Sequence, residues 1–570
     1  MNRLSKLKTI FIKYNIDGYL VPKNDHYFNE YIDTKKDRLR FVSGFTGSAG
    51  IALILKNNNY LFVDGRYIEQ AKKQSSRNFK IIDSSKQSVA QCINDLKLKI
   101  GFDSKLIKHS WYKQIKSNSN LTEIRENLID LIWKPKKENV RKETYILENC
   151  YSGNSYINKI TKIKKILKLN KRKSFFISSS ENICWLLNIR GKDSAFSPIL
   201  NSQGLLTDKK LFIFSEKNKI PNSIKKNYKK YVKFVDEKQL YNHLIKIKKN
   251  LIELDPNNSV NIINYLKKNK INFRFRSDII YKLKSKKNKI EIQNTKLAHI
   301  YDGSAVTKFI IWLKQQKKLT KLNEISAQKK LEIFRKINNQ YLFPSFPTIS
   351  AFAKNAAIIH YHATIKSNLS FRMNGIYLID SGGQYKQGTT DVTRTICFGK
   401  QNLSIQNIYT RILKGHLAVK NFKINKKTTG KKLDIVARKY LVKHGLNYPH
   451  STGHGVGYFL NVHENPPSIS KYSKNKFSLG QIISNEPGYY KPGHFGMRIE
   501  NLIYVNKNKR GLHFSDLTLV PYEKNLINKK LLIKQEITSI NNYHKIVFEL
   551  LKSFMNKKEL LILKDLCSPI

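Results

Sequence analysis

The chain has 570 residues, with 105 Lys or Arg against 41 Asp or Glu, so its formal net charge is +64. This length predicts three or four domains, and a hydrophobic fraction of 40% is enough to build real cores. Basic residues are spread from end to end without a single basic stripe among aromatic residues, which indicates an AT-rich coding sequence rather than a specific nucleic-acid binder.

Sequence features also bear on the compartment. The five cysteines are scattered and form no CxxC pair, which argues against a disulfide framework and favours a reducing environment. Residues 1–13 are charged throughout and lack the apolar core of a signal peptide, and no run approaches the ~18 apolar residues of a membrane span. We therefore expect a cytoplasmic protein with no membrane partner.

The first part of the chain alternates helical and strand patterns. The expected elements are a helix over 4–14, strands at Gly18–Val21 and Ile51–Leu55, and a strand at Tyr60–Val63 that ends in a turn before another helix. Such alternation is typical of an α/β unit.

A basic stretch at Lys134–Lys142, broken by Pro135, is predicted to be a linker. Beyond it the pattern predicts a second α/β unit, although no internal repeat is obvious in the sequence. Its expected elements are a helix over 156–169, a strand at Ser174–Ser178 and a helical turn at Glu181–Leu187. A Lys-rich run near 284–289 marks the next boundary. We predict domains at 1–145, 146–286 and 287–570.

In the third domain, helical spacing predicts a helix over 290–316 and two more over about 404–422 and 431–444. Ser404 is the expected N-cap of the second of these helices, and Gly445 is expected to stop the third. Expected strands are Ile376–Ile379, 392–398, Gln481–Ser484 and Met497–Tyr504. Residues i and i+2 of an extended strand face the same way, so we expect Arg498 and Glu500 to share a face.

The most informative stretch runs from His450 to Gly457 and continues through His463, with histidines among glycines that allow close backbone approach. Four acids stand in matching contexts, next to glycine- or threonine-rich turns or within apolar strands: Asp380, Asp391, Glu486 and Glu500. Together with His454, these acids form a candidate site for hard cations.

Charge repulsion sets the composition of that site. At ~4 Å and an effective dielectric near 20, each pair of like charges costs ~4 kcal/mol, so four converging carboxylates need a counter-charge, which two divalent cations supply. Oxygen-rich ligands favour Mn²⁺, with Zn²⁺ and Co²⁺ left open. Two such ions can share a bridging water, lower its pKa and polarise a carbonyl. Glu486 is the candidate general base.

The remaining histidines exceed what one binuclear site can use as ligands. His360, His450 and His463 are candidates for hydrogen bonding to a substrate carbonyl and its tetrahedral oxyanion, although each alone is equally consistent with an ordinary surface or core residue. His362 we interpret as ordinary. Arg498 is expected to hydrogen-bond a ligand carboxylate, the alternative being a cross-strand ion pair.

The motifs together resemble aminopeptidase P (Xaa-Pro aminopeptidase) of the pita-bread metallopeptidase family, in its long, three-domain form. The matching stretches are 358–361, 378–385, 388–395, 450–463, 485–490 and 498–501, with 41–50 and 64–67 in the first domain and 185–191 in the second. The resemblance covers nearly the whole chain. It implies an α/β (α+β) protein with two creatinase-N-like α/β domains followed by a pita-bread catalytic domain.

The implied activity is release of an N-terminal residue from peptides with proline at the second position, by attack of a metal-bridging hydroxide. The implied metal ligands are Asp380, Asp391, His454, Glu486 and Glu500. By the same resemblance, Asp391 and Glu500 bridge the ions and Asp380 lies near the free α-amine. His360, His450 and His463 handle substrate and protons, the chain forms a homodimer, and the loop after Trp185, including Arg190, reaches toward an active site, its own or the partner's.

Two positions depart from the family pattern: Ser451 replaces a glycine before Thr452, and Asn465 replaces a glycine after Glu464. Neither is a ligand. The alternatives to the aminopeptidase are a prolidase, which needs a carboxylate clamp for dipeptides, a metal-free peptide-binding module, and a nucleic-acid binder suggested by charge alone. Retention of all five ligand types disfavours the binding module.

Overall fold

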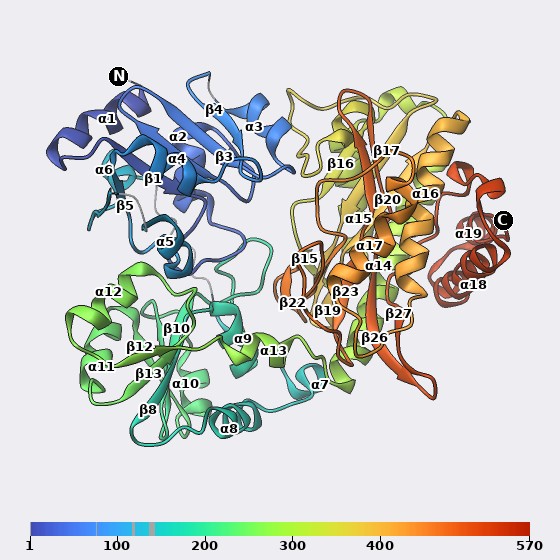
Figure 1. The fold of residues 1–570 in the computed structure, drawn as a ribbon. Helices are drawn as coiled ribbons and strands as arrows, with labels where there is room; N and C mark the ends of the chain where they lie inside the picture. The colour runs from blue at the N-terminus through green and yellow to red at the C-terminus, as the bar shows by residue number, and fades with distance from the viewer. Residues whose placement is uncertain (1, 76, 117–119, 136–142) are drawn as a thin grey trace. The chain divides into compact units, whose positions relative to one another are not determined.

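The computed structural model describes residues 2–570 except 76, 117–119 and 136–142. The predicted linker at Lys134–Lys142 therefore lies mostly outside the described residues. The chain divides into two compact units (Figure 1): Met1–Asn149 with Asn154–Ile280, and Cys150–Gly153 with Tyr281–Ile570.

The first unit begins with a six-stranded sheet in the order β4-β3-β2-β1-β5-β6. Its strands are β1 (Gly18–Pro22), β2 (Ile51–Leu55), β3 (Asn59–Val63), β4 (Lys80–Asp83), β5 (Lys99–Phe102) and β6 (Asn120–Glu123). The accompanying helices are α1 (Arg3–Lys13), α2 (Arg38–Ser43), α3 (Ile68–Gln74), α4 (Val89–Leu96), α5 (His109–Lys116) and α6 (Leu128–Ile132). Helix α1 buries Leu4, Leu7 and Phe11, which recur at helical spacing on one face.

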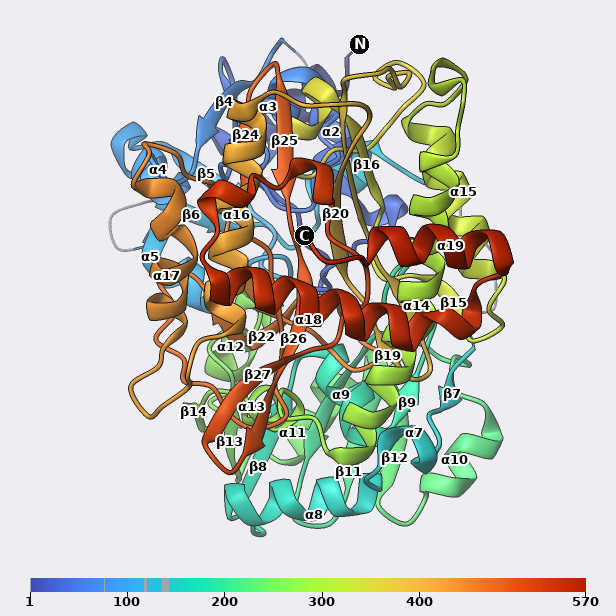
Figure 2. The same cartoon turned by 90° about the vertical axis from the view of Figure 1, so that its right-hand side faces the viewer.

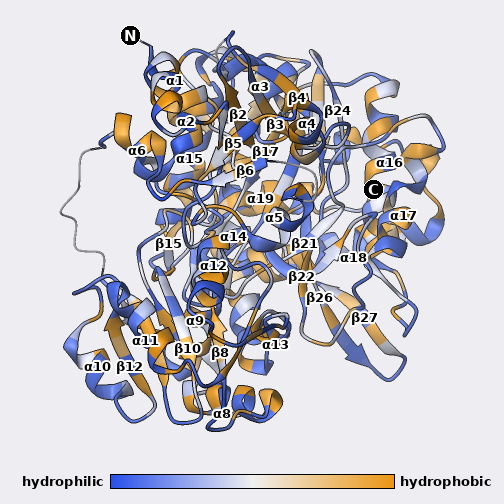
Figure 3. Cartoon of the chain, turned by 60° about the vertical axis from the view of Figure 1, so that its left-hand side comes forward, coloured by the Kyte–Doolittle hydropathy of each residue, from blue (hydrophilic) through white to orange (hydrophobic). Residues whose placement is uncertain are grey.

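A second six-stranded sheet follows in the order β12-β11-β10-β8-β13-β14. Its strands are β8 (Lys173–Ile177), β10 (Ser202–Leu206), β11 (Leu211–Ser215), β12 (Val232–Asp236), β13 (Leu251–Leu254) and β14 (Phe273–Phe275), and β7 (Tyr145–Ile146) pairs with β9 (Ile189–Arg190) beside it. The helices are α8 (Tyr156–Leu167), α9 (Ser180–Leu187), α10 (Asn222–Tyr228), α11 (Leu240–Lys246) and α12 (Val260–Lys268), and the short helices α7 (Asn149–Ser152) and α13 (Ile279–Lys284) lie at the boundaries with the second unit. Helix α8 carries both hydrophilic and hydrophobic segments (Figure 3) because only one face, with Ile160 and Ile163, is buried.

The two sheets share one topology. Numbered along the chain within each sheet, both have the spatial order 4-3-2-1-5-6, and the parallel and antiparallel pairings agree at every position. The sequence shows no obvious repeat, because a fold constrains hydrophobic pattern and turn position far more than residue identity. The tandem α/β architecture is therefore a repeat of structure.

The second unit is built from four small sheets with the orders β15-β18-β19, β16-β17-β20, β22-β21-β23-β26-β27 and β24-β25. The strands are β15 (Tyr341–Pro344), β16 (Ile349–Phe352), β17 (Ile376–Ser381), β18 (Gly383–Tyr385), β19 (Gly388–Thr389), β20 (Val392–Cys397), β21 (Gly453–Gly455), β22 (Glu464–Ile469), β23 (Ile482–Asn485), β24 (Gly488–Lys491), β25 (Phe495–Arg498), β26 (Asn501–Asn508) and β27 (Gly511–Asp516). Of the acids and histidines singled out in the sequence, Asp380 lies on β17 and His454 on β21, and the others lie in the connections between strands.

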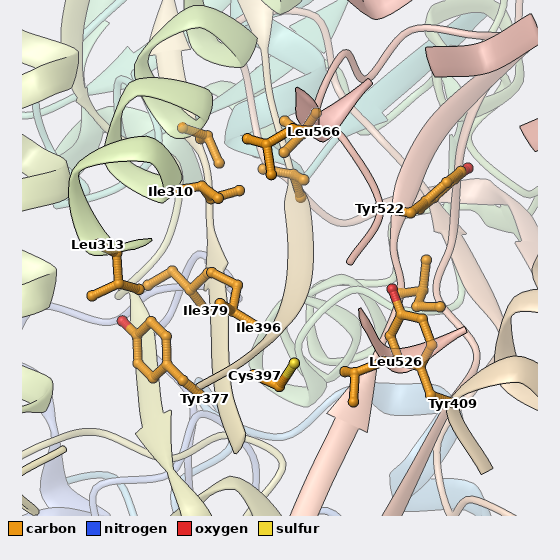
Figure 4. Packing of buried hydrophobic residues seen from close by; sticks show 14 of the residues in the cluster. Ile310, Leu313, Tyr377, Ile379, Ile396, Cys397, Tyr409, Tyr522, Leu526 and Leu566 are labelled. Carbon is orange, nitrogen blue, oxygen red and sulfur yellow. The ribbon is translucent and has the colours of Figure 1, made fainter. Parts of the chain in front are cut away.

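Helices cover these sheets: α14 (Lys289–Lys314), α15 (Glu324–Lys336), α16 (Leu403–Lys420), α17 (Gly430–Val442), α18 (Lys534–Leu551) and α19 (Lys557–Leu566). Helices α18 and α19 both pack against α14 (Figure 2). The largest apolar cluster of this unit joins α14, β17, β20, α16 and the C-terminal helices, and Figure 4 shows Ile310, Ile379 and Ile396 among its side chains. Burial of this apolar surface holds β17 and β20 in place.

Most predicted elements are found within one or two residues, but two details differ. The expected strand Met497–Tyr504 is interrupted at Ile499 and Glu500, whose N–H groups donate to the carbonyls of Pro487 and Thr393, so β25 and β26 are separate strands in different sheets. The N-cap of α16 is Asn402, whose side chain accepts from the Ile405 N–H, and not Ser404. The prediction that Gly445 stops α17 is confirmed: after the helix ends at Val442, Gly445 adopts the left-handed conformation (φ +70°), its N–H donates to the Val442 carbonyl oxygen, and the Leu446 N–H donates to that of Leu441.

Within the described residues, no helix combines the length and the apolar character needed to cross a membrane. All five cysteines carry free thiols, and Cys150 alone among them is exposed.

Candidate metal centre

Two antiparallel strand pairs supply the four predicted acids. In the first pair, Asp380 on β17 lies opposite Thr393 on β20, and Asp391 directly precedes β20. In the second pair, Asn485 of β23 lies opposite Asn501 of β26. Glu486 directly follows β23 and Glu500 directly precedes β26, so the two glutamates lie at the same end of this strand pair. The strand registers thus bring four acids from distant segments to the ends of two neighbouring ladders.

His454 lies on β21, which pairs with β23 through Gly455 and Ile483. Its Nε2 is 3.5 Å from Asp391 Oδ2 and 3.6 Å from Glu486 Oε1. The ligand atoms of Asp391, His454 and Glu500 all lie within 4.8 Å of one another. The Nδ1 of His454 is 2.8 Å from the carbonyl oxygen of Gly455, which can only accept, so Nδ1 donates and Nε2 is the ring nitrogen that faces the acids.

The glycines beside His454 are needed for this approach. A Cβ added at Gly453 would lie 2.0 Å from the carbonyl oxygen of Ser484, and one added at Gly455 would lie 2.4 Å from that of Glu464. Any side chain at either position would push β21 away from its neighbours. The glycine-rich pattern therefore reflects close backbone packing around His454.

The cluster carries more negative charge than the protein around it neutralises. Burial, and then the neighbouring carboxylates Asp380 and Glu486, raise the pKa of Asp391 well above its usual range. Burial, and then Asp391 and Glu486, do the same to the pKa of Glu500. Burial also raises the pKa of Glu486, against the opposing effect of His454. Such shifts are the electrostatic mark of a site that binds cations.

The donor set fits hard divalent ions. Asp380 Oδ2 accepts from Arg498 Nη2 at 2.5 Å, whereas its buried Oδ1 has no hydrogen-bond partner among the described residues. An orphaned carboxylate oxygen is costly unless something outside the chain binds it. Four carboxylates and one imidazole suit Mn²⁺-like and other divalent ions, and the crowded acids provide charge for two of them.

Neighbouring polar groups hold the acids in orientation. Thr393 Oγ1 donates to Glu500 Oε2 at 2.7 Å and accepts from Arg498 Nε at 3.0 Å. Ser484 Oγ accepts from the His454 N–H at 2.9 Å and lies 3.1 Å from Glu486 Oε1, to which it donates. Although β25 and β26 belong to different sheets, Arg498 and Glu500 still meet, through Thr393. Such contacts set ligand geometry before any ion binds.

Arg498, 2% exposed, links the acids to His450 through Tyr490. Its Nη1 donates to the Tyr490 hydroxyl at 2.7 Å, and that hydroxyl lies 2.9 Å from His450 Nε2. His450 Nδ1 is 2.8 Å from the Ser451 carbonyl oxygen, so Nδ1 donates and Nε2 accepts from Tyr490. Sequence reasoning missed Tyr490. Its only signal was its place at the end of the matching stretch 485–490, shortly after Glu486.

The candidate substrate histidines occupy different surroundings. His450 Nδ1 is 4.0 Å from Glu486 Oε2, and the ring of His463 lies 4.2 Å from the ring of His454. His360 is half-buried in the turn after the short helix η4 (Ala353–Ala357), which packs against β25. His362, interpreted as ordinary from the sequence, is also half-buried, and burial lowers its pKa.

Arg190 lies in the first unit, on β9, and is 2% exposed. Its Nη1 donates to the carbonyl oxygens of Cys184 and Ile189, so the guanidinium is held within its own α/β domain. Its expected role in binding substrate stays a prediction. The two departures from the family pattern, Ser451 and Asn465, are exposed, and neither has a positive φ.

Comparisons with known proteins cover the whole chain. The model of metallopeptidase family M24 matches residues 293–507, the C-terminal region of peptidase_M24 matches 510–570, and two creatinase/prolidase N-terminal domain models match 3–130 and 133–291.

Among curated relatives, a probable Xaa-Pro aminopeptidase P of Pyrenophora teres f. teres is 33% identical over 98% of this chain and 91% of its own length. Xaa-Pro aminopeptidase 1 of Dictyostelium discoideum is 34% identical over 100% of this chain and 96% of its own. The crystal structure of X-prolyl aminopeptidase from Caenorhabditis elegans, described as a cytosolic enzyme with a di-nuclear active site, superposes with a TM-score of 0.94 at 28% identity and covers 100% of this chain and 99% of that one.

Proposed function

The chain belongs to the Xaa-Pro aminopeptidases of metallopeptidase family M24, and from this membership we propose that it releases the N-terminal residue of peptides whose second residue is proline. The resemblance seen in the sequence and the predicted fold class, two creatinase-type α/β domains and a pita-bread domain, are confirmed. The observation that carries the proposal is the convergence of Asp391, His454 and Glu500 within 4.8 Å, among buried acids whose charge is not neutralised.

We assign the metal ligands as Asp380, Asp391, His454, Glu486 and Glu500. When bound, two divalent ions would neutralise the cluster and supply an acidified water and a Lewis acid for the scissile carbonyl. The oxygen-rich donor set favours Mn²⁺, with Zn²⁺ and Co²⁺ as alternatives. Asp380, whose Oδ1 is buried without a partner among the described residues, is also the candidate to lie near the substrate α-amine.

Glu486 is the proposed general base. Its side chain is 18% exposed, so it can reach both the buried ligands and an entering substrate. The Ser484 hydroxyl holds its Oε1, whereas Oε2 lies toward His450. A carboxylate fixed at one oxygen and open at the other can take a proton from a water and return it to the departing amine.

His360, His450 and His463 are proposed to bind the substrate carbonyl and the oxyanion that develops from it, and Arg498 to orient Asp380 and, through Tyr490, His450. Both ring nitrogens of His450 have partners, Nδ1 in the Ser451 carbonyl oxygen and Nε2 in the Tyr490 hydroxyl, so His450 can offer an N–H to the oxyanion only when one of these contacts opens. Hydrogen-bond donors already in place at the oxyanion contribute most to catalysis, because they need no reorganisation during the reaction.

Proline at the second position explains the need for a dedicated enzyme. The Xaa-Pro amide has no N–H and its ring fixes φ, so a peptidase that recognises backbone donors binds it poorly. We propose an apolar surface near His450 that includes Tyr448 and Tyr490, whose rings lie 4.9 and 5.4 Å from the imidazole. We also propose that the protein acts in the cytoplasm, as the Caenorhabditis elegans neighbour does, and as a homodimer.

The proposal is tested with metal-stripped protein, an Xaa-Pro-Xaa tripeptide and an Xaa-Pro dipeptide, each with and without Mn²⁺. Mn²⁺-dependent release of the first residue from the tripeptide is the expected result. Turnover of the dipeptide alone would identify a prolidase. Binding of the tripeptide without turnover under any metal would identify a peptide-binding module and overturn the proposal.

A further inference from the structure

Glu324, the first residue of α15, is a buried acid outside the metal cluster. It is 0% exposed, and it forms no ion pair within the described part of the chain. Burial raises the pKa of its carboxyl group, and hydrogen bonds from surrounding donors oppose that rise. Burying a carboxylate lowers the stability of the fold by several kcal/mol unless hydrogen bonds compensate. The groups that donate to Glu324 therefore indicate its role.

The donors to that carboxylate come from one segment, residues 352–369, which we term the His360 loop. Oε1 accepts from the Phe352 N–H at 2.6 Å and from Asn355 Nδ2 at 3.1 Å. Oε2 accepts from the Tyr361 hydroxyl at 2.8 Å and from the Leu369 N–H at 3.0 Å. One carboxylate thus binds the beginning, the middle and the end of the loop.

The backbone of Glu324 strengthens the same attachment. Its N–H donates to the Leu369 carbonyl oxygen at 3.2 Å, and its carbonyl oxygen accepts from Ser350 Oγ at 2.6 Å. Glu324 also lies in the first turn of a 13-residue helix, where the positive end of the helix dipole favours a negative charge. The helix end and the carboxylate therefore act together as an anchor.

The loop is also held from within, close to His360. Asn355 Nδ2 donates to the Tyr361 hydroxyl at 2.9 Å and to the Ser367 carbonyl oxygen at 2.8 Å. On its other side the loop packs against β25, where a Cβ added at Gly496 would lie only 1.9 Å from the Ala356 carbonyl oxygen. Because β25 ends at Arg498, the same loop connects Glu324 to the strand that carries the arginine bound to Asp380.

We propose that Glu324 is a positioning residue for catalysis, which fixes the His360 loop so that His360 meets the substrate in one orientation. The inference rests on the proposed function, in which His360 binds the substrate carbonyl. Glu324 touches neither substrate nor metal, and it acts through Tyr361, the immediate neighbour of His360.

The test is Glu324→Gln. Glutamine has the same shape, but its NH₂ group can only donate hydrogen bonds. Where it replaces a carboxylate oxygen it faces other donors, so the hydrogen bonds to that oxygen are lost. We expect kcat/KM for an Xaa-Pro-Xaa tripeptide to fall about 10- to 100-fold, as for outer-shell substitutions, with Mn²⁺ stoichiometry unchanged. Hydrogen exchange at the Phe352 and Leu369 amides should become faster. Unchanged kcat/KM, or loss of bound Mn²⁺, would overturn the inference.

A double variant separates positioning from general damage. If Glu324 acts through His360, adding Glu324→Gln to His360→Ala should lower kcat/KM little further than His360→Ala alone. Multiplicative losses would show that Glu324 acts by another route. The matched control is Glu523→Gln, another buried acid of the second unit, bound to Lys314 at 2.7 Å, which should reduce stability without changing kcat/KM.

If Glu324→Gln does not fold, Tyr361→Phe removes one donor with little change of shape and should give the same pattern with a smaller loss. Unaltered kinetics in Tyr361→Phe would then overturn the inference. The two proposals fail separately. Wild-type protein that cleaves no Xaa-Pro peptide with Mn²⁺ overturns the proposed function and the inference that rests on it, whereas an active wild type with a fully active Glu324→Gln overturns the inference alone.

Discussion

Glu253 in the first unit and the acid cluster in the second bury carboxylates in opposite ways. Glu253, on β13, is 0% exposed and forms ion pairs with Lys173 at 3.2 Å, with Arg276 at 3.1 Å and with Arg274. Burial alone would raise its pKa, but hydrogen bonds from Arg274 and Lys173 outweigh burial and lower it. The strand register places Arg274 directly opposite Glu253, so the sheet itself provides the counter-charge.

In the acid cluster burial is not outweighed. Burial, and then the neighbouring carboxylates, raise the pKa values of Asp391 and Glu500, and the guanidinium of Arg498 opposes this rise without cancelling it. A buried acid neutralised by its own sheet is structural, whereas acids left without enough counter-charge indicate a site that binds a cation from solution. The difference between the two regions is therefore a functional signal, and it can be tested by changing each in turn.

The largest expected effect follows Glu486→Gln. Loss of the proposed base should lower kcat about 10²- to 10⁴-fold. In metal-free protein, however, the substitution removes one of several repelling charges, so thermal unfolding should occur at the same or a higher temperature than in the wild type. Steady-state kinetics with Mn²⁺ and calorimetry in a chelator check the two halves. Full activity of the variant would contradict the role of Glu486 as the base. A lower unfolding temperature of the metal-free variant would contradict the conclusion that the acids lack sufficient positive counter-charge.

Metal removal should affect the two regions differently. A ligand that binds only the native state stabilises it by about 2.7 kcal/mol at 100 times its dissociation constant. Adding Mn²⁺ to stripped protein should therefore raise the unfolding temperature of the wild type and of Glu253→Gln equally, but raise that of Asp391→Asn much less. If Mn²⁺ raised the unfolding temperature of all three proteins equally, the ion would bind at a site other than the acid cluster.

Glu253→Gln should reverse the behaviour of Glu486→Gln. Removing the carboxylate leaves Lys173, Arg274 and Arg276 without their shared partner, and because these cations are partly exposed we expect a loss of about 2 kcal/mol in unfolding free energy. The kcat/KM per folded molecule should not change. Denaturant unfolding and peptide kinetics on the same preparation measure both, and a large loss of kcat would refute a purely structural role.

The smallest effect concerns buried histidines, which stay neutral and so do not bury a charge that lacks a counter-charge. Burial lowers the pKa of His416 and of His544 to about 3, against an ordinary value of 6.5. Below pH 6.5 the unfolded chain therefore binds protons that the native chain excludes, and stability falls as pH falls toward 3. Between pH 6.5 and 5.5 the loss should be about 1 kcal/mol per histidine. His416→Gln should reduce this slope by one histidine's share, as measured by denaturant unfolding at each pH.

Local pattern predicted most of the secondary structure, because helix and strand periodicity depends on neighbours in the chain. The strand Ile51–Leu55 and the long helix α14 were found almost where the pattern placed them. The break between Arg498 and Asn501 was missed, because the amides of Ile499 and Glu500 bond to carbonyls of Pro487 and Thr393 in other segments. No window of local sequence contains those partners.

The candidate site divides in the same way. Residue types and the glycine-rich setting of His454 were enough to indicate the ligand set, since four acids and an imidazole suit few partners other than hard cations. Tyr490 and Glu324 gave no comparable signal. The role of Tyr490 depends on its contacts with Arg498 and His450. The role of Glu324 depends on a loop that ends 45 residues away along the chain.

The sequence by itself determined most of the elements that form and which side chains are candidates to hold two divalent ions, because both depend on residue type and short-range pattern. Only the tertiary structure decided that one oxygen of Asp380 lacks a partner among the described residues, that Glu253 is neutralised while Glu500 is not, and that Glu324 binds the His360 loop. The physical reason is that the energy of a buried charge is set by the groups that share its space, and strand register and packing bring those groups together from distant parts of the chain.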